Sequence, residues 1–153
     1  MATGTETYGI IQSTNVRCAE ASFTADGAGT YTATFAIPAG STVLDVIFRN
    51  TVVWDNADSA SLVVGDDDDA DGYIAATDVK TAPAADTNGA AAGLSSRLSL
   101  GATAGAYKGG GGKYCAVAKT ITATITAAGA GTAGRSRILV EYITPTAAAA
   151  TKV

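Results

Sequence analysis

The strongest constraint on the fold is a two-residue alternation of apolar and polar side chains. In KTITATITA (119–127), Ile121, Ala123 and Ile125 lie on one side of an extended chain, and threonines occupy the other side. Successive side chains of a β-strand point to opposite faces, so this pattern predicts a strand with one buried face. No apolar stripe with the helical period continues for more than one turn. The sequence therefore predicts an all-β protein.

The same alternation, or a short apolar run, recurs between turn-forming residues. It predicts further strands at 7–12, 16–24, 29–37, 41–50, 59–65, 112–119 and 135–143. Glycine, proline, aspartate and asparagine lie between most of these segments, where they favour turns. Short strands at this spacing are typical of an antiparallel β-sandwich of the jelly-roll kind. A chain of 153 residues fits one such domain.

Two of the predicted strands indicate which side faces the core. In GTYTATFAI (29–37), the apolar side consists of Tyr31, Ala33, Phe35 and Ile37. In STVLDVIFRN (41–50), we expect Leu44, Val46 and Phe48 to face the core, because the alternate residues include an aspartate and an arginine.

Two segments lack large apolar side chains. Residues 81–112 are rich in glycine and alanine and end in four glycines, although LSSRLSL (94–100) has enough leucine to add a strand. We expect an excursion across one edge of the sandwich. The tail, residues 144–153, is expected to be a flexible C-terminal arm.

The charges are divided along the chain. The net charge of −4 argues against a nucleic-acid partner, because phosphate binding requires a basic surface. Eight aspartates and no basic residue lie between Asp55 and Asp78, whereas the segment from Arg97 to Arg137 has basic residues and no acid. Either the acidic face of one copy meets the basic face of another, or both are solvated surfaces.

The sequence offers no sign of export or of a membrane span. The N-terminal segment MATGTETYGI lacks the basic and apolar regions of a signal peptide, and no apolar run approaches the ~20 residues that a spanning helix needs. Cys18 and Cys115 match no metal-binding spacing. We expect both to be buried, small apolar residues of a protein made in a reducing cytosol, with a disulfide as the alternative.

Residues for catalysis are scarce. The chain has no histidine, which excludes Ser-His-Asp and Cys-His catalysis and most zinc sites. GGGGK (109–113) lacks the spacing and the hydroxyl residue of a phosphate-binding loop. We therefore expect a protein that is not an enzyme and has no organic cofactor.

One acidic segment, GDDDDADGYIAATD (65–78), has the order of ligands found in a calcium loop. The candidate Ca²⁺ ligands are Asp67, Asp69, Asp71, Tyr73 through its carbonyl, and Asp78. The preceding residues predict a strand, whereas an EF-hand loop lies between helices. The alternative is a solvated acidic turn that bends at Asp71-Gly72.

Two stretches together resemble a known family. AIPAGSTVLDVIF (36–48) and SASLVVGDDDDADGYIAATDV (59–79) resemble a strand and a following hairpin in head decoration (cement) proteins of tailed bacteriophages. The resemblance spans residues 29–79. It departs from the family pattern where Asp-Ala-Asp replaces the frequent Asp-Pro-Asp.

The resemblance implies a structural virion protein with a jelly-roll core. Such a protein would trimerise on the major capsid protein, bridge capsomers at the capsid surface, and assemble in the host cytoplasm. Contacts would then come from Ala2–Ile11, the 81–112 excursion and the C-terminal arm. The alternative is a receptor- or glycan-binding module of a head or tail fibre, which would need exposed aromatic residues. Trp54, Tyr73 and Tyr107 are the candidates for that role.

Overall fold

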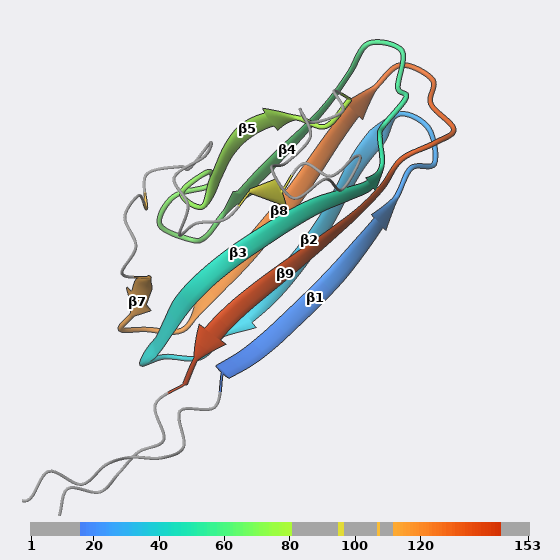
Figure 1. Cartoon of the computed structure of the whole chain (residues 1–153). Coiled ribbons are helices and arrows are strands. Elements are labelled where there is room, and N and C mark those ends of the chain that lie inside the picture. Colours follow the sequence, from blue (N-terminus) through green and yellow to red (C-terminus); the bar gives the residue numbers. More distant parts are fainter. Residues whose placement is uncertain (1–15, 81–94, 97–106, 108–111, 145–153) are drawn as a thin grey trace, which may run out of the picture.

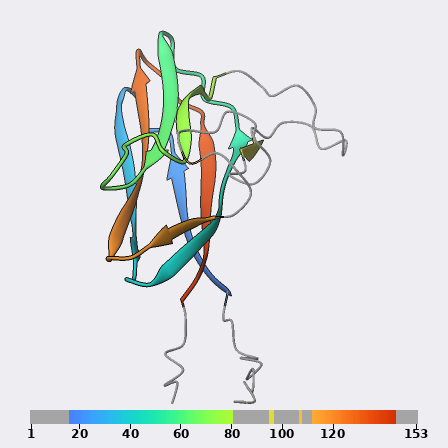
Figure 2. The ribbon, with the colours of Figure 1, turned by 90° about the vertical axis from the view of Figure 1, so that its left-hand side faces the viewer.

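The computed structural model describes residues 16–80, 95–96, 107 and 112–144, and it has no helix in these ranges. The strands are β1 (Val16–Thr24), β2 (Gly29–Ile37), β3 (Ser41–Val52), β4 (Ser59–Gly65), β5 (Ile74–Asp78), β6 (Ser95–Ser96), β7 (Lys113–Cys115), β8 (Lys119–Ala128) and β9 (Arg135–Ile143). They form two antiparallel sheets, one on the other (Figures 1 and 2). The predicted all-β sandwich is confirmed.

The order of the strands is that of a jelly roll. Sheet A has the order β1-β9-β3, with β6 and β7 both paired to β3, and sheet B has the order β2-β8-β4-β5. Strands β1 to β4 alternate between the two sheets, and so do β7 to β9. Sheet neighbours are therefore distant in sequence, as expected when two Greek keys build a sandwich.

The core lies between the sheets, on the side that the alternation predicts. Ile121, Ala123 and Ile125 of β8 are fully buried, while the threonines between them face outward. On β2, Phe35 and Ile37 are buried as well. The largest fully buried side chains are Trp54, Tyr73, Phe48, Ile37, Leu62, Ile74, Ile121, Ile125, Ile138, Val43, Val46 and Val64.

Strand β3 departs from its predicted pattern at one position. Val46 and Phe48 face the core as expected, but Leu44 is only half-buried and Val43 is fully buried instead. The register against β9 shifts between Val43 and Asp45, so Leu44 is an extra residue in a β-bulge. A bulge interrupts the alternation, and the prediction for Leu44 was wrong for that reason.

Residues 112–119 do not form one strand. Strand β7 pairs with β3 in sheet A, whereas β8 begins at Lys119 in sheet B. The intervening residues 116–118 therefore cross from one sheet to the other, a corner that periodicity alone does not reveal.

The two cysteines have different surroundings. Cys115 is buried as predicted, but Cys18 is exposed on the edge strand β1, and both thiols are free. The prediction of a buried Cys18 was wrong, because its side chain lies on the outer face of sheet A, where alternation along β1 directs it.

Several predictions concern residues outside the described ranges. They are the strand at 7–12, the contact segment Ala2–Ile11, most of the 81–112 excursion, and the C-terminal arm beyond Thr144. Within the excursion, Ser95 and Ser96 form β6, which lies inside the predicted strand at 94–100. Among the described residues, no helix could cross a membrane.

Candidate functional site

The turn between β4 and β5, residues 65–73, is folded tightly on itself and is called here the acidic turn. The Asp66 amide donates to the Asp69 carbonyl at 2.8 Å, and the Tyr73 amide donates to the Val64 carbonyl at 3.0 Å. The chain passes so close to Gly65 that a Cβ there would lie 2.0 Å from the carbonyl carbon of Ala70. The sequence can form this turn only because residue 65 is glycine.

Asp66 is the centre of the acidic turn. Its side chain is completely buried and accepts five hydrogen bonds. Two come from the backbone amides of Asp68 and Asp69, at 3.0 and 3.3 Å. The other donors are Tyr73 Oη at 3.1 Å, Tyr107 Oη at 2.9 Å and Lys113 Nζ at 2.6 Å. A carboxylate with this many donors is held in its ionised form.

Lys113 and the two tyrosines close one side of this site. The ammonium group of Lys113 lies 3.7 Å from the centroid of the Tyr107 ring, a cation–π arrangement. The Tyr73 and Tyr107 rings meet edge to face with centroids 5.0 Å apart. Tyr107 also donates its amide to the Gly72 carbonyl at 2.9 Å. We call Asp66, Tyr73, Tyr107 and Lys113 the Asp66 cluster.

A second lysine binds the outer part of the acidic turn. Asp68 accepts from Lys113 Nζ at 3.1 Å and from Lys119 Nζ. Asp67 Oδ2 accepts the amide of Thr120 at 2.9 Å. The last pair between β4 and β8 is Gly65 with Thr122, so no β4 residue lies opposite Thr120. Asp67 therefore accepts the hydrogen bond of the Thr120 amide in place of a β4 carbonyl.

The electrostatics of the site follow from these contacts. Burial opposes ionisation of Asp66, but hydrogen bonds from Lys113, the Asp68 amide and Tyr107 outweigh it and lower the pKa of Asp66 below 3.8. Burial likewise opposes the charge of Lys113, yet its hydrogen bonds to Asp66, Tyr107 and Asp68 raise its pKa. The exposed Asp71 behaves oppositely, because the neighbouring Asp69 carboxylate raises its pKa.

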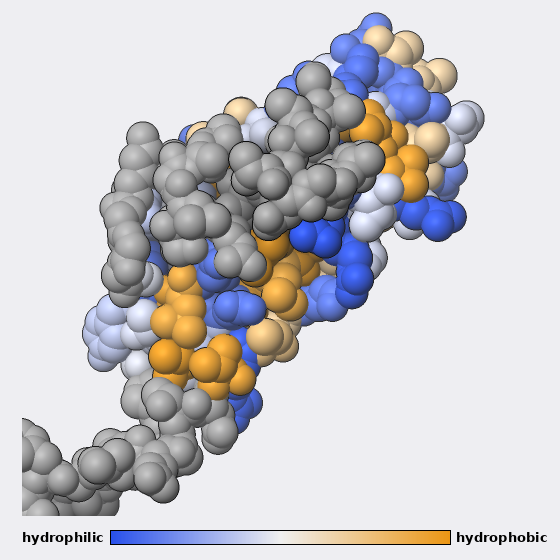
Figure 3. All heavy atoms as spheres, viewed as in Figure 1, coloured by the Kyte–Doolittle hydropathy of each residue, from blue (hydrophilic) through white to orange (hydrophobic). Residues whose placement is uncertain are grey.

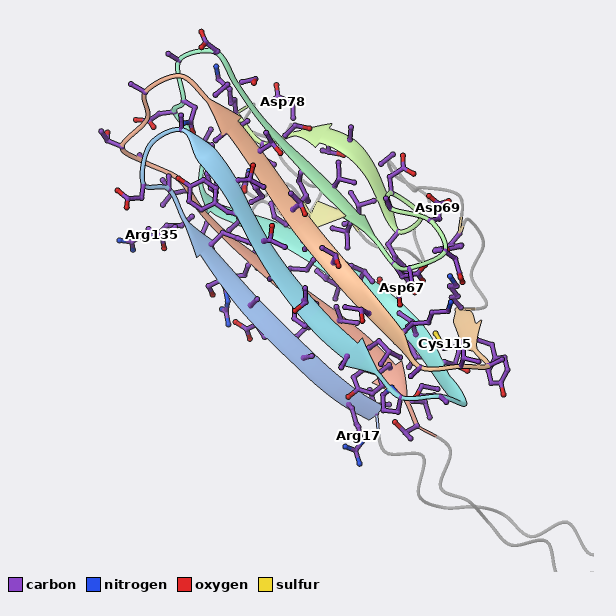
Figure 4. The ribbon with its side chains drawn as sticks, turned by 180° about the vertical axis from the view of Figure 1, so that it is seen from behind. Arg17, Asp67, Asp69, Asp78, Cys115 and Arg135 are labelled. Carbon is purple, nitrogen blue, oxygen red and sulfur yellow. The ribbon has the colours of Figure 1, made fainter. Side chains whose placement is uncertain are left out.

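The structure does not gather the five candidate calcium ligands around one point. Asp67 accepts from Thr120, and Asp69 Oδ1 accepts the Asp71 amide at 3.3 Å. Asp78 lies at the far end of β5, where its Oδ1 accepts the Lys80 amide at 2.8 Å (Figure 4). Tyr73, proposed as a ligand through its carbonyl, directs its side chain into the Asp66 cluster. The described part of the chain contains no group of three or more Asp, Glu, Cys or His residues placed to hold a metal ion.

Lys113 and Lys119 supply positive charge beside the aspartates of the acidic turn, where the sequence predicted a candidate calcium ion. The acidic and basic segments, expected to meet between copies or to remain solvated, meet in part within one chain: Lys113 and Lys119 contact Asp66 and Asp68. Asp66 precedes the calcium pattern and was therefore missed. The signal that pointed to this contact was the separation of acids and bases along the sequence.

The chain also has a buried polar network at the opposite end of the sandwich. Trp54 Nε1 donates to Ser136 Oγ at 2.8 Å, and Ser136 Oγ donates to Asn50 Oδ1 at 2.6 Å. Asn50 Nδ2 donates to the Val79 carbonyl at 3.0 Å. This network joins β3 and β9 to the end of β5 and holds Trp54 inside the core.

The chain was compared with protein-family models, curated proteins and solved structures. No family model, curated protein or solved structure matches this chain. In both the Asp66 cluster and the Trp54 network, every buried polar side-chain atom has a hydrogen-bond partner, and both link strands from different parts of the sequence. Both are therefore built to hold elements together.

Proposed function

We propose that this protein is a structural component of a tailed-phage virion, a cement protein that trimerises on the major capsid protein and bridges capsomers. The observation that carries the proposal is the acidic turn. In the sequence, this turn belongs to one of the two stretches that resemble decoration proteins. In the fold, Lys113 ties it to β7 and Lys119 ties it to the start of β8.

The jelly-roll fold also supports a structural role. A cement protein must resist the outward force of packaged DNA, and its binding energy comes from wide surfaces and not from a deep pocket. A sandwich whose β4–β5 turn is fixed by the buried ion pair of Lys113 and Asp66 suits that mechanical task. The turn between β2 and β3, Pro38-Ala39-Gly40, belongs to the other resembling stretch (36–48), and Gly40 has a φ of 76° there.

The fibre module is the weaker candidate. It requires aromatic side chains on the surface, but Trp54 is 1% exposed and Tyr73 is 0% exposed. Tyr107 packs its ring against Tyr73 and directs its hydroxyl to Asp66. These three residues therefore serve the interior of the fold and do not form a stacking surface for a sugar.

Antibody labelling of virions tests the proposal. We expect label over the whole capsid surface, together with co-sedimentation of the purified protein with shells assembled from the major capsid protein. Label confined to fibres would favour the alternative, and absence of the protein from virions would refute both. Sedimentation equilibrium of the free protein tests the expected trimer.

A further inference from the structure

The described strands leave four sheet edges, and three of these edges are protected against pairing with another chain. An edge strand presents unpaired N–H and C=O groups, which proteins protect by charge, by shortness or by a bulge. The edge strand β1 carries Arg17 and Glu20. Strands β6 and β7 are only two and three residues long. Strand β5 is short, shifts its register against β4 and ends at Asp78.

Strand β2 forms the fourth edge and has none of these protections. It is nine residues long and contains neither a charged residue nor a proline. Its register against β8 runs from Gly29 to Ile37 through consecutive pairs without a shift. Within the described part of the chain, no strand pairs with the other side of β2. Every second residue of an antiparallel edge strand directs its N–H and C=O groups to that open side.

The outward side chains of β2 are uncharged as well. Thr30, Thr32, Thr34 and Ala36 are exposed, and their partners on β8 are the threonines of 120–126. Figure 4 views this face of sheet B, with β2 beside β8. The outer side of sheet A, in contrast, has strongly hydrophilic residues beside apolar ones (Figure 3). A strand that approaches β2 therefore displaces no charged side chain and meets no like charge.

The sequence of β2 reads nearly the same in both directions from Ala33. Thr32 and Thr34 lie on either side of it, and the aromatic residues Tyr31 and Phe35 come next. When two identical strands pair antiparallel about their centre, residues at equal distances from that centre lie opposite each other. Each of these side chains would thus meet one of similar size and polarity. This symmetry favours a second copy of β2 over an unrelated strand.

We propose that β2 pairs antiparallel with β2 of a second copy, about a two-fold axis that passes through Ala33 perpendicular to the sheet. In this register Thr32 lies opposite Thr34 of the second copy, and Tyr31 lies opposite Phe35 of the second copy. The axis keeps the outer faces of both sheets on the same side, so the two four-stranded sheets join into one. Threonines opposite each other on paired strands add to the stability of the contact.

The size of this side of the sandwich is sufficient for a specific contact. A nine-residue strand is about 30 Å long. Strand β1 of the other sheet lies next to β2 on this side, and two sheets stacked about 10 Å apart give the side a width of about 20 Å. The pair would therefore bury about 600 Å² per copy, or about 1,200 Å² in total, which is the lower end of the range for stable interfaces.

This pairing does not depend on the virion role. A single chain forms a dimer through β2, and a closed trimer would join a second trimer about the same two-fold axes. Loss of the contact therefore halves the mass of the assembly in either case. The test uses purified protein and is separate from the test of the proposed function, which uses virions.

Charges introduced at Thr32 and Thr34 test both the strand and its register. In T32K/T34K, and likewise in T32E/T34E, each new charge lies opposite a like charge of the second copy. We expect both variants to have half the wild-type mass in sedimentation velocity at low salt. In T32K/T34E each lysine lies opposite a glutamate, and we expect the wild-type mass. An equimolar mixture of T32K/T34K and T32E/T34E should regain that mass, which a misfolded variant cannot do.

The matched control is T124K/T126K. It places the same two charges on the same face of sheet B, but on β8, one strand away from the open edge, so we expect the wild-type mass. Half mass in this control would assign the contact to the face of the sheet and overturn the proposal. Equal masses of wild-type protein and T32K/T34K would also overturn it, as would half mass in T32K/T34E or in the mixture. Hydrogen exchange adds a further check: β2 amides that become protected only when shells of the major capsid protein are added would assign the edge to a different partner.

Discussion

Gly65 shows how one residue without a side chain decides the shape of the acidic turn. A Cβ at this position would lie 2.2 Å from the carbonyl oxygens of Asp69 and Ala70, both of which are backbone atoms that cannot rotate away. We expect Gly65→Ala to destabilise the fold by about 2 kcal/mol, measured by urea unfolding. Gly29→Ala is the matched control, because nothing lies within 4 Å of a Cβ there. Equal stability of the two variants would contradict the close approach.

Lys113 gives a second prediction at the scale of the residue. Its removal in Lys113→Met leaves the buried Asp66 carboxylate without its cation, and we expect a loss of about 3 kcal/mol in the free energy of unfolding. Adding Asp66→Asn removes the uncompensated charge and should recover part of that loss. The exposed pair of Glu20 and Arg137 is the control, since Glu20→Gln should cost less than about 1 kcal/mol. An equal effect at both pairs would argue against a special role for Lys113.

Sequence alone identified the charged residues around this site but not their pairing. The aspartates of 66–71 and the lysines at 113 and 119 are visible as charges, and their separation along the chain suggested attraction. These acidic and basic residues pair within one chain because β7 and β8 pass beside the acidic turn. This proximity arises from the topology of the sandwich, which no local pattern contains.

At the scale of the element, alternation and turn residues were sufficient to place four strands. The predicted segments 16–24, 29–37, 59–65 and 135–143 have the same bounds as β1, β2, β4 and β9. Alternation failed where the backbone leaves the regular ladder. It misplaced Leu44 at the bulge of β3, and it joined β7 to β8 across the corner between the sheets.

The contact between β3 and β9 leads to a prediction for Ser136. This residue accepts from Trp54 Nε1 and donates to Asn50 Oδ1, both buried, so Ser136→Ala leaves a donor and an acceptor unsatisfied. We expect a loss of about 2 kcal/mol, seen as a lower urea midpoint. Ser22→Ala, on the exposed side of β1, should change the midpoint little. A midpoint unchanged in Ser136→Ala would indicate that water replaces the hydroxyl group.

At the scale of the whole molecule, the ion pairs of the acidic turn define the pH range of stability. The pKa of Asp66 and the pKa of Asp68 lie below 3.8 in the folded protein, so the stability that these groups contribute is complete at neutral pH and is lost as the pH falls through the lowered values. The pKa values of Lys113 and Lys119 lie above 10.5, so their contribution is lost only as the pH rises beyond that value.

Acid unfolding measures this effect. We expect the urea midpoint of the wild-type protein to fall steeply below about pH 4 and that of the double variant D66N/K113M to fall less steeply, because the variant has lost one of the groups that titrate. Parallel acid profiles for the two proteins would show that other carboxylates dominate the acid transition.

The pairing of Val16 with Ile143 has a consequence for the reach of the molecule. Because β1 begins where β9 ends, the chain enters and leaves the sandwich at the same end, while the loops after β1, β3 and β8 lie at the other end and bind one another through backbone hydrogen bonds. The nine-residue strands separate these two ends by about 30 Å. Anything joined to the chain before Val16 or after Ile143 is therefore attached at this one end of the sandwich, opposite the three loops.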